Sequence, residues 1–195
     1  AIYPQIPART LPELVAWMKA HPDQAKVATS GRGSAQEMAA EMFRMASGVE
    51  MLLVPYKGSS AAHPDLLGGR TALYIDTISA IAPQVKGGNV RAVAVSTLKR
   101  TVALPDVPAA DEQGLKGFDA NTNGGFLAPA GTPKAIVDKL NAEINAALKL
   151  PDVRSKLEAA GIEIQGGTPQ DYAALIKSDL AKWAKVVKAA GIQPD

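Results

Sequence analysis

Apolar and polar positions alternate in blocks along the first half of the chain. Short apolar runs fall at residues 26–29, 51–55, 71–76 and 90–96, and the segments between them carry apolar residues at helical spacing. Strands that alternate with helices are typical of βαβ units and a mostly parallel sheet. The pattern therefore predicts an α/β domain with four strands. The run at residues 51–55 is continuously apolar, which predicts a strand buried on both faces.

Capping residues mark where the helices begin. Thr10 precedes the first helical pattern, and Ser34 precedes the second, with Glu37 three residues on as a capping-box partner. The second helix has an apolar stripe that we interpret as core filler. This stripe consists of Met38, Met42, Phe43 and Met45.

The second half of the chain has a different texture. Thr132 and Thr168 are each followed by proline, which predicts helix caps with proline at the first helical position. Further helices are expected near residues 108–113 and 152–160, and an edge strand at residues 162–164. Amphipathic helices need a partner surface. We expect them to fold back on the first sheet or to belong to a sheet that this chain lacks, and their exposed stripes predict self-association.

The candidate chemistry begins where the first strand ends, in the turn Ser30-Gly31-Arg32-Gly33-Ser34. Glycine permits backbone conformations that a β-carbon hinders. A strand, a glycine turn and a helix start aim free N–H groups at one point, with the positive end of the helix dipole behind them. The turn thus predicts an anion cradle for a carboxylate or phosphate, although it is neither a Walker A loop nor a GxGxxG motif. An ordinary capped turn is the alternative interpretation.

Two further polar turns follow strands in the same way. Tyr56-Lys57-Gly58 follows the second run and Asp76-Thr77 follows the third. In open parallel sheets, ligands bind at the carboxyl ends of the strands. We therefore expect the three turns to share one rim. The candidate ligand-binding residues are Ser30, Gly31, Arg32, Ser34, Tyr56, Lys57, Gly58, Asp76 and Thr77.

Three of these side chains have alternative interpretations. Arg32 is either a carboxylate clamp, because its guanidinium matches two oxygens, or a solvated loop residue. Lys57 is better read as an anion contact or a solvated side chain than as a Schiff-base lysine. Asp76 would accept hydrogen bonds from a ligand amine, hydroxyl or bridging water, or it would cap the following helix.

Composition excludes several classes of protein. The hydrophobic content of 47% and charged content of 21% are those of a globular protein rather than a disordered one. The net charge of +2 is spread along the chain and aromatic residues make up 5%, so no nucleic acid partner is expected. The absence of cysteine excludes disulfides, thiolate nucleophiles and cysteine-ligated zinc.

No catalytic, metal or cofactor site is predicted. His21 and His63 have no second ligand at metal-binding spacing, and SGRGS is not a GxSxG nucleophile motif. No apolar run approaches the roughly 20 residues that span a bilayer. The first ten residues lack the features of a signal peptide, which is compatible with a leader that has been removed.

Four motifs in fixed order carry a family resemblance. They are VPYKG at residues 54–58, DLLGG at 65–69, LPDVP at 104–108 and APAGTP at 128–133. With these motifs, the chain resembles, essentially from end to end, the solute-binding proteins of tripartite tricarboxylate transporters, the Bug family.

The resemblance implies a periplasmic-binding-protein-like α/β fold with two domains hinged around a cleft. Such a protein captures a small organic acid and passes it to a membrane permease. The resemblance also implies that this chain lacks the N-terminal part of the first domain. Residues 10–122 would be the complete ligand-binding second domain, and residues 123–195 a helical portion that returns to the first. Glu37 departs from the family pattern, where histidine is common.

The resemblance therefore predicts a periplasmic receptor for a carboxylate, with permease subunits as partners and no enzymatic activity. Two other function classes remain open at this point. One is a truncated sensor or interaction module that binds no solute. The other is an enzyme that uses Lys57 and Asp76 on a carboxylic acid.

Overall fold

The computed structural model describes residues 1–192. Its elements are α1 (Leu11–Ala20), β1 (Lys26–Thr29), α2 (Ala35–Ser47), β2 (Leu52–Pro55), α3 (Ser59–Leu67), β3 (Leu73–Tyr74), α4 (Ile78–Lys86), α5 (Lys134–Ala147), α6 (Pro151–Ala159) and α7 (Pro169–Ala190). Residues 193–195, the end of the expected C-terminal portion, lie outside the described residues. In the described part of the chain, no helix is long and apolar enough to cross a membrane.

The sheet has three parallel strands in the order β2-β1-β3. Ala28 of β1 lies opposite Val54 of β2 and Tyr74 of β3. Each crossover from one strand to the next contains a helix, as parallel pairing requires. The predicted α/β class with a parallel sheet is confirmed.

The predicted fourth strand at residues 90–96 is wrong. Ile2 lies between β3 and this segment and forms single antiparallel bridges to Leu73 on one side and Arg91 on the other. Val95 forms a separate bridge to Ala109. Because the N-terminal segment takes the place beside β3, residues 90–96 have no continuous strand partner.

The prediction that β2 is buried on both faces is also wrong. β2 is an edge strand that pairs only with β1, and Leu52 is 60% exposed. A continuous apolar run is common in buried strands, but it does not fix the position of a strand in the sheet.

The predicted helix caps are largely confirmed. The side chains of Thr10, Ser34 and Thr168 each accept the backbone N–H of the residue three positions on. The cap expected at Thr132 is wrong, because α5 begins at Lys134 and the Thr132 hydroxyl donates to a carbonyl in the preceding turn.

Two short elements expected in the second half are not formed. Residues 108–113 make turns, where Glu112 accepts the N–H of Ala109 at 3.0 Å in place of a helical bond. Residues 162–164 are extended without a strand partner, and Ile162 is 47% exposed.

The core lies on both faces of the sheet. On one face Leu14, Val27 and Phe43 bury the contact with α1 and α2, and on the other Leu66 of α3 packs with Tyr74 of β3. The stripe of α2 fills this core as expected at Met38, Met42 and Phe43, whereas Met45 is half exposed.

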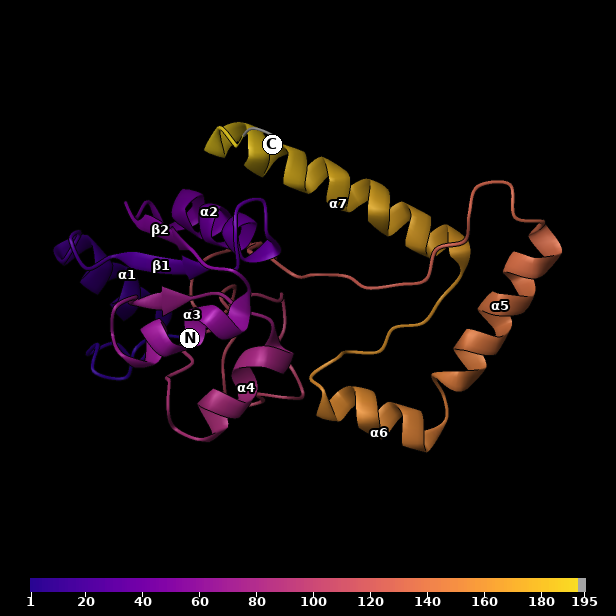
Figure 1. Ribbon diagram of the computed structural model, residues 1–195, viewed down its shortest axis with the longest axis horizontal. Helices are drawn as coiled ribbons and strands as arrows, with labels where there is room; N and C mark the ends of the chain where they lie inside the picture. Colours follow the sequence, from indigo (N-terminus) through magenta and orange to yellow (C-terminus); the bar gives the residue numbers. More distant parts are fainter. Residues whose placement is uncertain (193–195) are drawn as a thin grey trace.

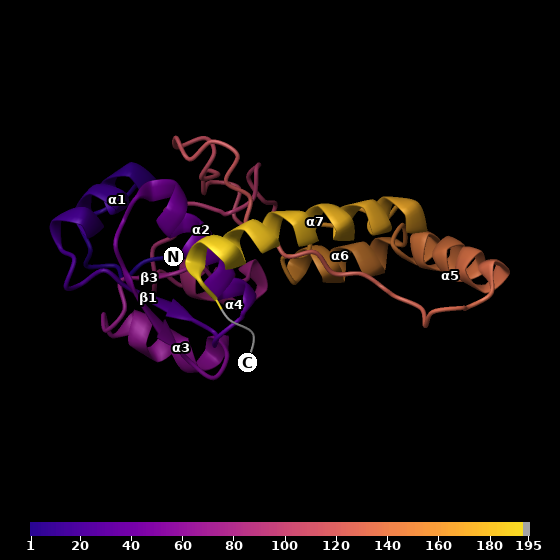
Figure 2. The same cartoon turned by 90° about the horizontal axis from the view of Figure 1, so that it is seen from above.

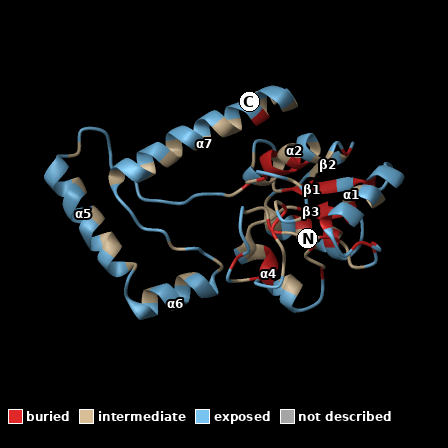
Figure 3. Cartoon of the chain, turned by 180° about the vertical axis from the view of Figure 1, so that it is seen from behind, coloured by how far each residue is buried: buried red, intermediate tan, exposed pale blue. Residues whose placement is uncertain are grey.

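Residues 123–192, which we call the arm, project to one side of residues 1–122, which we call the body (Figures 1 and 2). No residue of α5 or α6 is buried. The end of α7 packs on the body, where Val186 is buried and Trp183 contacts the core beside α2. Figure 3 shows this contrast in burial.

The arm is tied to the body at two places. At one, Lys182 Nζ of α7 lies 3.7 Å from Asp119 Oδ2 of the body. At the other, Gly161 follows α6 and packs so closely on the start of α4 that a β-carbon would lie 2.9 Å from Ile78 Cγ2. The chain after α6 therefore contacts the body at the start of α4.

Candidate ligand-binding site

Backbone hydrogen bonds join the first two predicted turns at the carboxyl ends of β1 and β2. The Tyr56 N–H donates to the Thr29 carbonyl at 3.0 Å, and the Gly58 N–H donates to the Ser30 carbonyl at 3.1 Å. Gly31 has φ +132°, and a β-carbon there would lie 3.4 Å from the Tyr56 carbonyl oxygen. The positive φ of Gly31 therefore favours glycine where the two turns meet.

Two side chains accept backbone N–H groups at the start of α2. Ser34 Oγ accepts the Glu37 N–H at 3.2 Å, as predicted. The Glu37 carboxylate accepts the N–H of Gly33 at 2.5 Å, whereas the Ser34 N–H donates to the Gly31 carbonyl. Glu37 therefore stabilises the turn. In a full capping box its carboxylate would accept the N–H of Ser34 instead of that of Gly33.

This turn leaves several backbone donors open. Within residues 1–192, the N–H groups of Gly31, Arg32, Ala35 and Gln36 have no protein acceptor. They lie at the amino terminus of a helix of 13 residues, where the helix dipole is positive. Such a group of donors has the chemistry to hold an anion.

The third turn is anchored by a buried carboxylate. Asp76 Oδ1 accepts hydrogen bonds from Ser59 Oγ at 2.7 Å, the Thr77 N–H at 2.8 Å and Gln36 Nε2 at 3.2 Å. Asp76 Oδ2 lies 2.8 Å from His63 Nε2, and the Asp76 side chain is fully buried. Four partners satisfy a charge that would be costly to bury alone.

Gln36 connects the first turn to this carboxylate. Ser30 donates to Gln36 Oε1 at 2.6 Å, while the amide nitrogen of Gln36 donates to Asp76. Of the predicted residues, Ser30, Asp76 and Thr77 therefore share one hydrogen-bonded network. The predicted cap of α4 by Asp76 is replaced by this network, since Thr77 is the residue at the N-cap.

The sequence patterns did not indicate four members of the network: Gln36, Ser59, His63 and Tyr74, whose hydroxyl donates to Ser59 Oγ at 3.0 Å. Ser59 and His63 are four residues apart, which places them on one face of α3, directly after the second turn. That spacing was the available signal. It did not reveal that Asp76, from a different strand, lies against the same face.

Tyr56 is turned away from Asp76. Its hydroxyl donates to Asp65 at 2.7 Å, and Arg70 donates to the other oxygen of Asp65 at 2.8 Å. Burial, together with the hydrogen bond to Asp65, raises the pKa of Tyr56 to about 12. The hydrogen bonds from Tyr56 and Arg70 lower the pKa of Asp65. The phenol therefore stays a neutral donor at physiological pH.

Arg32 and Lys57 are exposed. Neither side chain has a hydrogen-bond or ion-pair partner within the described part of the chain. Because both residues belong to the rim turns and are exposed, their positive charges are available to an approaching anion.

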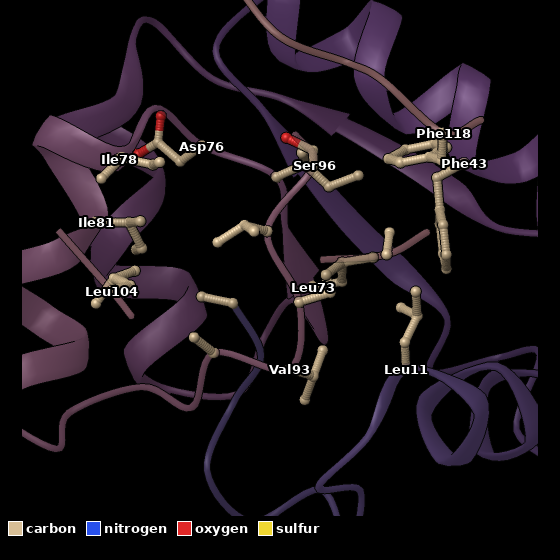
Figure 4. Close-up of a pocket in the computed structure, with 16 residues that line it drawn as sticks. Leu11, Phe43, Leu73, Asp76, Ile78, Ile81, Val93, Ser96, Leu104 and Phe118 are labelled. Carbon is tan, nitrogen blue, oxygen red and sulfur yellow. The ribbon is translucent and has the colours of Figure 1, made fainter. Parts of the chain in front are cut away.

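A cavity of about 70 Å³ lies beside this rim (Figure 4). Its wall comes mainly from residues 73–81 and 92–96, and its side chains are apolar except for Asp76 and Ser96. Asp76 is the one predicted site residue in that wall. Among residues 1–192, no group of three or more histidine, aspartate or glutamate side chains is arranged to hold a metal ion.

The profile of one protein family, described as "Tripartite tricarboxylate transporter family receptor" (TctC), matches residues 1–192. The chain belongs to this family. The predicted resemblance is thereby confirmed. The chain is 38% identical over 180 residues to the "UPF0065 protein in tcbD-tcbE intergenic region" of Pseudomonas sp. (strain P51), which covers 92% of this chain and 54% of that protein. The chain spans about half the length of the curated relatives it matches.

Several solved structures have a similar fold. "R. palustris Rpa4515 with adipate" has a TM-score of 0.85 and 35% identity, covering 100% of this chain and 65% of that one. The "periplasmic binding protein BugD" has a TM-score of 0.81 and 34% identity, covering 100% and 66%. "MatC (Rpa3494) from Rhodopseudomonas palustris with bound malate" has a TM-score of 0.77 and 31% identity, covering 95% and 64%. The predicted periplasmic-binding-protein-like fold is confirmed.

Proposed function

We propose that this TctC-family chain is a solute receptor that captures a small organic acid for a tripartite tricarboxylate-type transporter. The observation that carries the proposal is the set of open N–H groups at Gly31, Arg32, Ala35 and Gln36. A carboxylate supplies the acceptors that these donors lack, and the dipole of α2 favours its charge. The adipate and malate held by the two relatives are both small dicarboxylic acids.

The side chains of the rim complete this binding mode. Ser34 accepts the helix N–H with its oxygen, so its hydroxyl hydrogen is available to the ligand. Arg32 and Lys57 add positive charge from the exposed side. Asp76 acts as an anchor that positions Gln36, Ser59 and Thr77, because its own carboxylate is buried and fully engaged.

The location and partners follow from the same proposal. The receptor works in the periplasm, as the relative BugD is described, and delivers its ligand to the membrane permease subunits. Residues 10–122 form the ligand-binding domain, and the arm belongs to the opposite wall of the site. Two observations support this division: the carboxyl end of β1, to which β3 runs parallel, points toward the side on which the arm lies (Figure 1), and Gly161 packs on the start of α4.

Removal of one backbone donor tests the proposal. Ala35 is the first residue of α2, where proline is tolerated, and the extended backbone of Ser34 suits a residue that precedes proline. Ala35→Pro therefore deletes one N–H with little cost to the fold. Ala35→Gly, which keeps the backbone N–H at the same position, is the matched control.

Isothermal titration with adipate and malate gives the readout. We expect saturable binding of at least one acid, weakened about tenfold or more by Ala35→Pro, since a hydrogen bond to a charged group is worth about 1.5–3 kcal/mol. Ala35→Gly should leave the affinity unchanged, because it keeps the N–H. Equal affinities in Ala35→Pro and the parent chain, or no binding of either acid, would contradict the proposal.

A further inference from the structure

A second pocket lies at the amino ends of the strands, opposite the rim turns. Its volume is about 330 Å³, and its wall includes Lys26 at the start of β1 and Ala72 just before β3. The rim turns follow the other ends of these strands. The pocket therefore shares no residue with the candidate site described above.

Two aromatic rings in the wall are held in place by the fold. The Tyr3 ring packs on Gly69, where φ is +72° and a β-carbon would lie 2.6 Å from the ring. Trp17 stacks on His21 with ring centroids 4.8 Å apart and an angle of 20° between the planes. His21 Nδ1 is also 2.9 Å from the Trp17 carbonyl oxygen. The rings thus need little further ordering to receive a ligand.

The polar part of the wall is cationic. Lys26 is exposed and has no carboxylate partner within residues 1–192. Arg70 is 79% exposed at its side chain and bonds Asp65 through one nitrogen, which leaves its other donors open. No acidic residue lines the pocket, and Gln24 adds a neutral amide.

We propose that this pocket binds a small organic anion with a planar apolar body, such as an aryl carboxylate. Lys26 and Arg70 meet the carboxylate, and Tyr3 and Trp17 flank the ring. Aromatic pairs add to affinity in offset or edge-to-face contact, and guanidinium matches the two oxygens of a carboxylate. The volume is that of a site for a small molecule rather than for an inorganic ion.

Trp17 reports directly on this pocket. The chain has two tryptophans, so Trp183→Phe leaves Trp17 as the single emitter. We expect benzoate to change its emission saturably, while benzamide, which has the same shape without the charge, has little effect. Lys26→Gln should weaken benzoate binding about tenfold, the factor equivalent to about 1.4 kcal/mol. Ala35→Pro in the rim should leave it unchanged.

Three outcomes would overturn the proposal. They are a response that rises linearly without saturation, an equal response to benzamide, and a response lost in Ala35→Pro but kept in Lys26→Gln. Should Trp183→Phe fail to fold, fluorine NMR of the parent chain labelled with 5-fluorotryptophan resolves the two rings. A shift confined to Trp183 would then contradict binding at the Trp17 pocket.

Discussion

The body and the arm are built from the same kind of helix, yet they differ sharply in burial. Among residues 1–192, every buried residue except Val186 belongs to the body. α5 has an amphipathic sequence like α2, but α2 buries Met38 and Phe43 whereas Ile136 and Leu140 of α5 are each 50% exposed. An amphipathic pattern therefore gives a helix an apolar face. That face is buried only where another surface packs against it.

This difference separates two kinds of stability in one chain. In the body, side chains are fixed by close packing and by a buried polar network, so substitutions there should affect the free energy of unfolding. In the arm, the same substitutions remove atoms that already face solvent. Matched pairs of variants, one in each region, test that distinction.

The largest difference is expected between two leucines. Leu14→Ala removes a fully buried side chain and should lower the free energy of unfolding by about 2–5 kcal/mol. Leu140→Ala in the arm should cost less than about 0.5 kcal/mol. Urea unfolding followed by circular dichroism measures both. Equal losses would mean that α5 is covered in solution.

The same pair tests self-association. If a second copy covers the arm, the loss in Leu140→Ala should grow with protein concentration, because association adds to stability by mass action. A sizing measurement over the same concentration range checks this prediction directly.

A smaller difference is expected between two glycines that both have positive φ. Gly69 packs under the Tyr3 ring, whereas Gly131 in the arm has φ +81° and no atom within 4 Å of the position that a β-carbon would occupy. Gly131→Ala should cost about 1–2 kcal/mol from the backbone alone. Gly69→Ala should cost about 1–3 kcal/mol more, because the ring must move. Thermal unfolding of both variants compares them, and equal costs would show that Tyr3 is not held against Gly69.

Buried and exposed carboxylates provide the next pair. Asp76→Asn replaces an acceptor of the buried network and should cost about 1.5–3 kcal/mol. Asp138→Asn breaks an exposed i,i+4 ion pair with Lys134 in the arm and should cost about 0.3–0.5 kcal/mol. Urea unfolding at pH 7 measures both values. A loss in Asp76→Asn as small as that in Asp138→Asn would contradict the anchoring role of Asp76.

The smallest effect concerns acid pH. The pKa of Asp65 is lower in the folded chain, chiefly because Tyr56 donates to it. Its stabilising contribution is therefore present above the pKa of the unfolded chain, near 4, and is lost as the pH falls through the folded pKa. Melting temperatures between pH 7 and pH 3 should fall less steeply in Asp65→Asn than in the parent chain. An unchanged slope would show that this contact adds no pH dependence.

The predictable part of the fold was local. Thr10, Ser34 and Thr168 cap helices through bonds to residues three positions away, so the sequence contains the whole interaction. The prediction of a fourth strand was wrong for a non-local reason. Ile2 occupies its place beside β3, and no pattern within residues 90–96 reveals that insertion.

The candidate site divides in the same way. The turn from Ser30 to Ser34 was predictable because strand, glycines and cap are contiguous. The burial of Asp76 was not, since its partners Gln36 and His63 come from two other elements. Tyr56 was expected on the rim, but its hydroxyl donates to Asp65 of α3. Strand and helix patterns do not specify this side-chain direction.

We infer that the open amides at the start of α2 receive a carboxylate. Titration of the ¹⁵N-labelled chain with adipate, followed by amide chemical shifts, tests it residue by residue. We expect the largest saturable changes at the N–H groups of Gly31, Arg32, Ala35 and Gln36. Binding of adipate that leaves these four amides unchanged while others shift would contradict it.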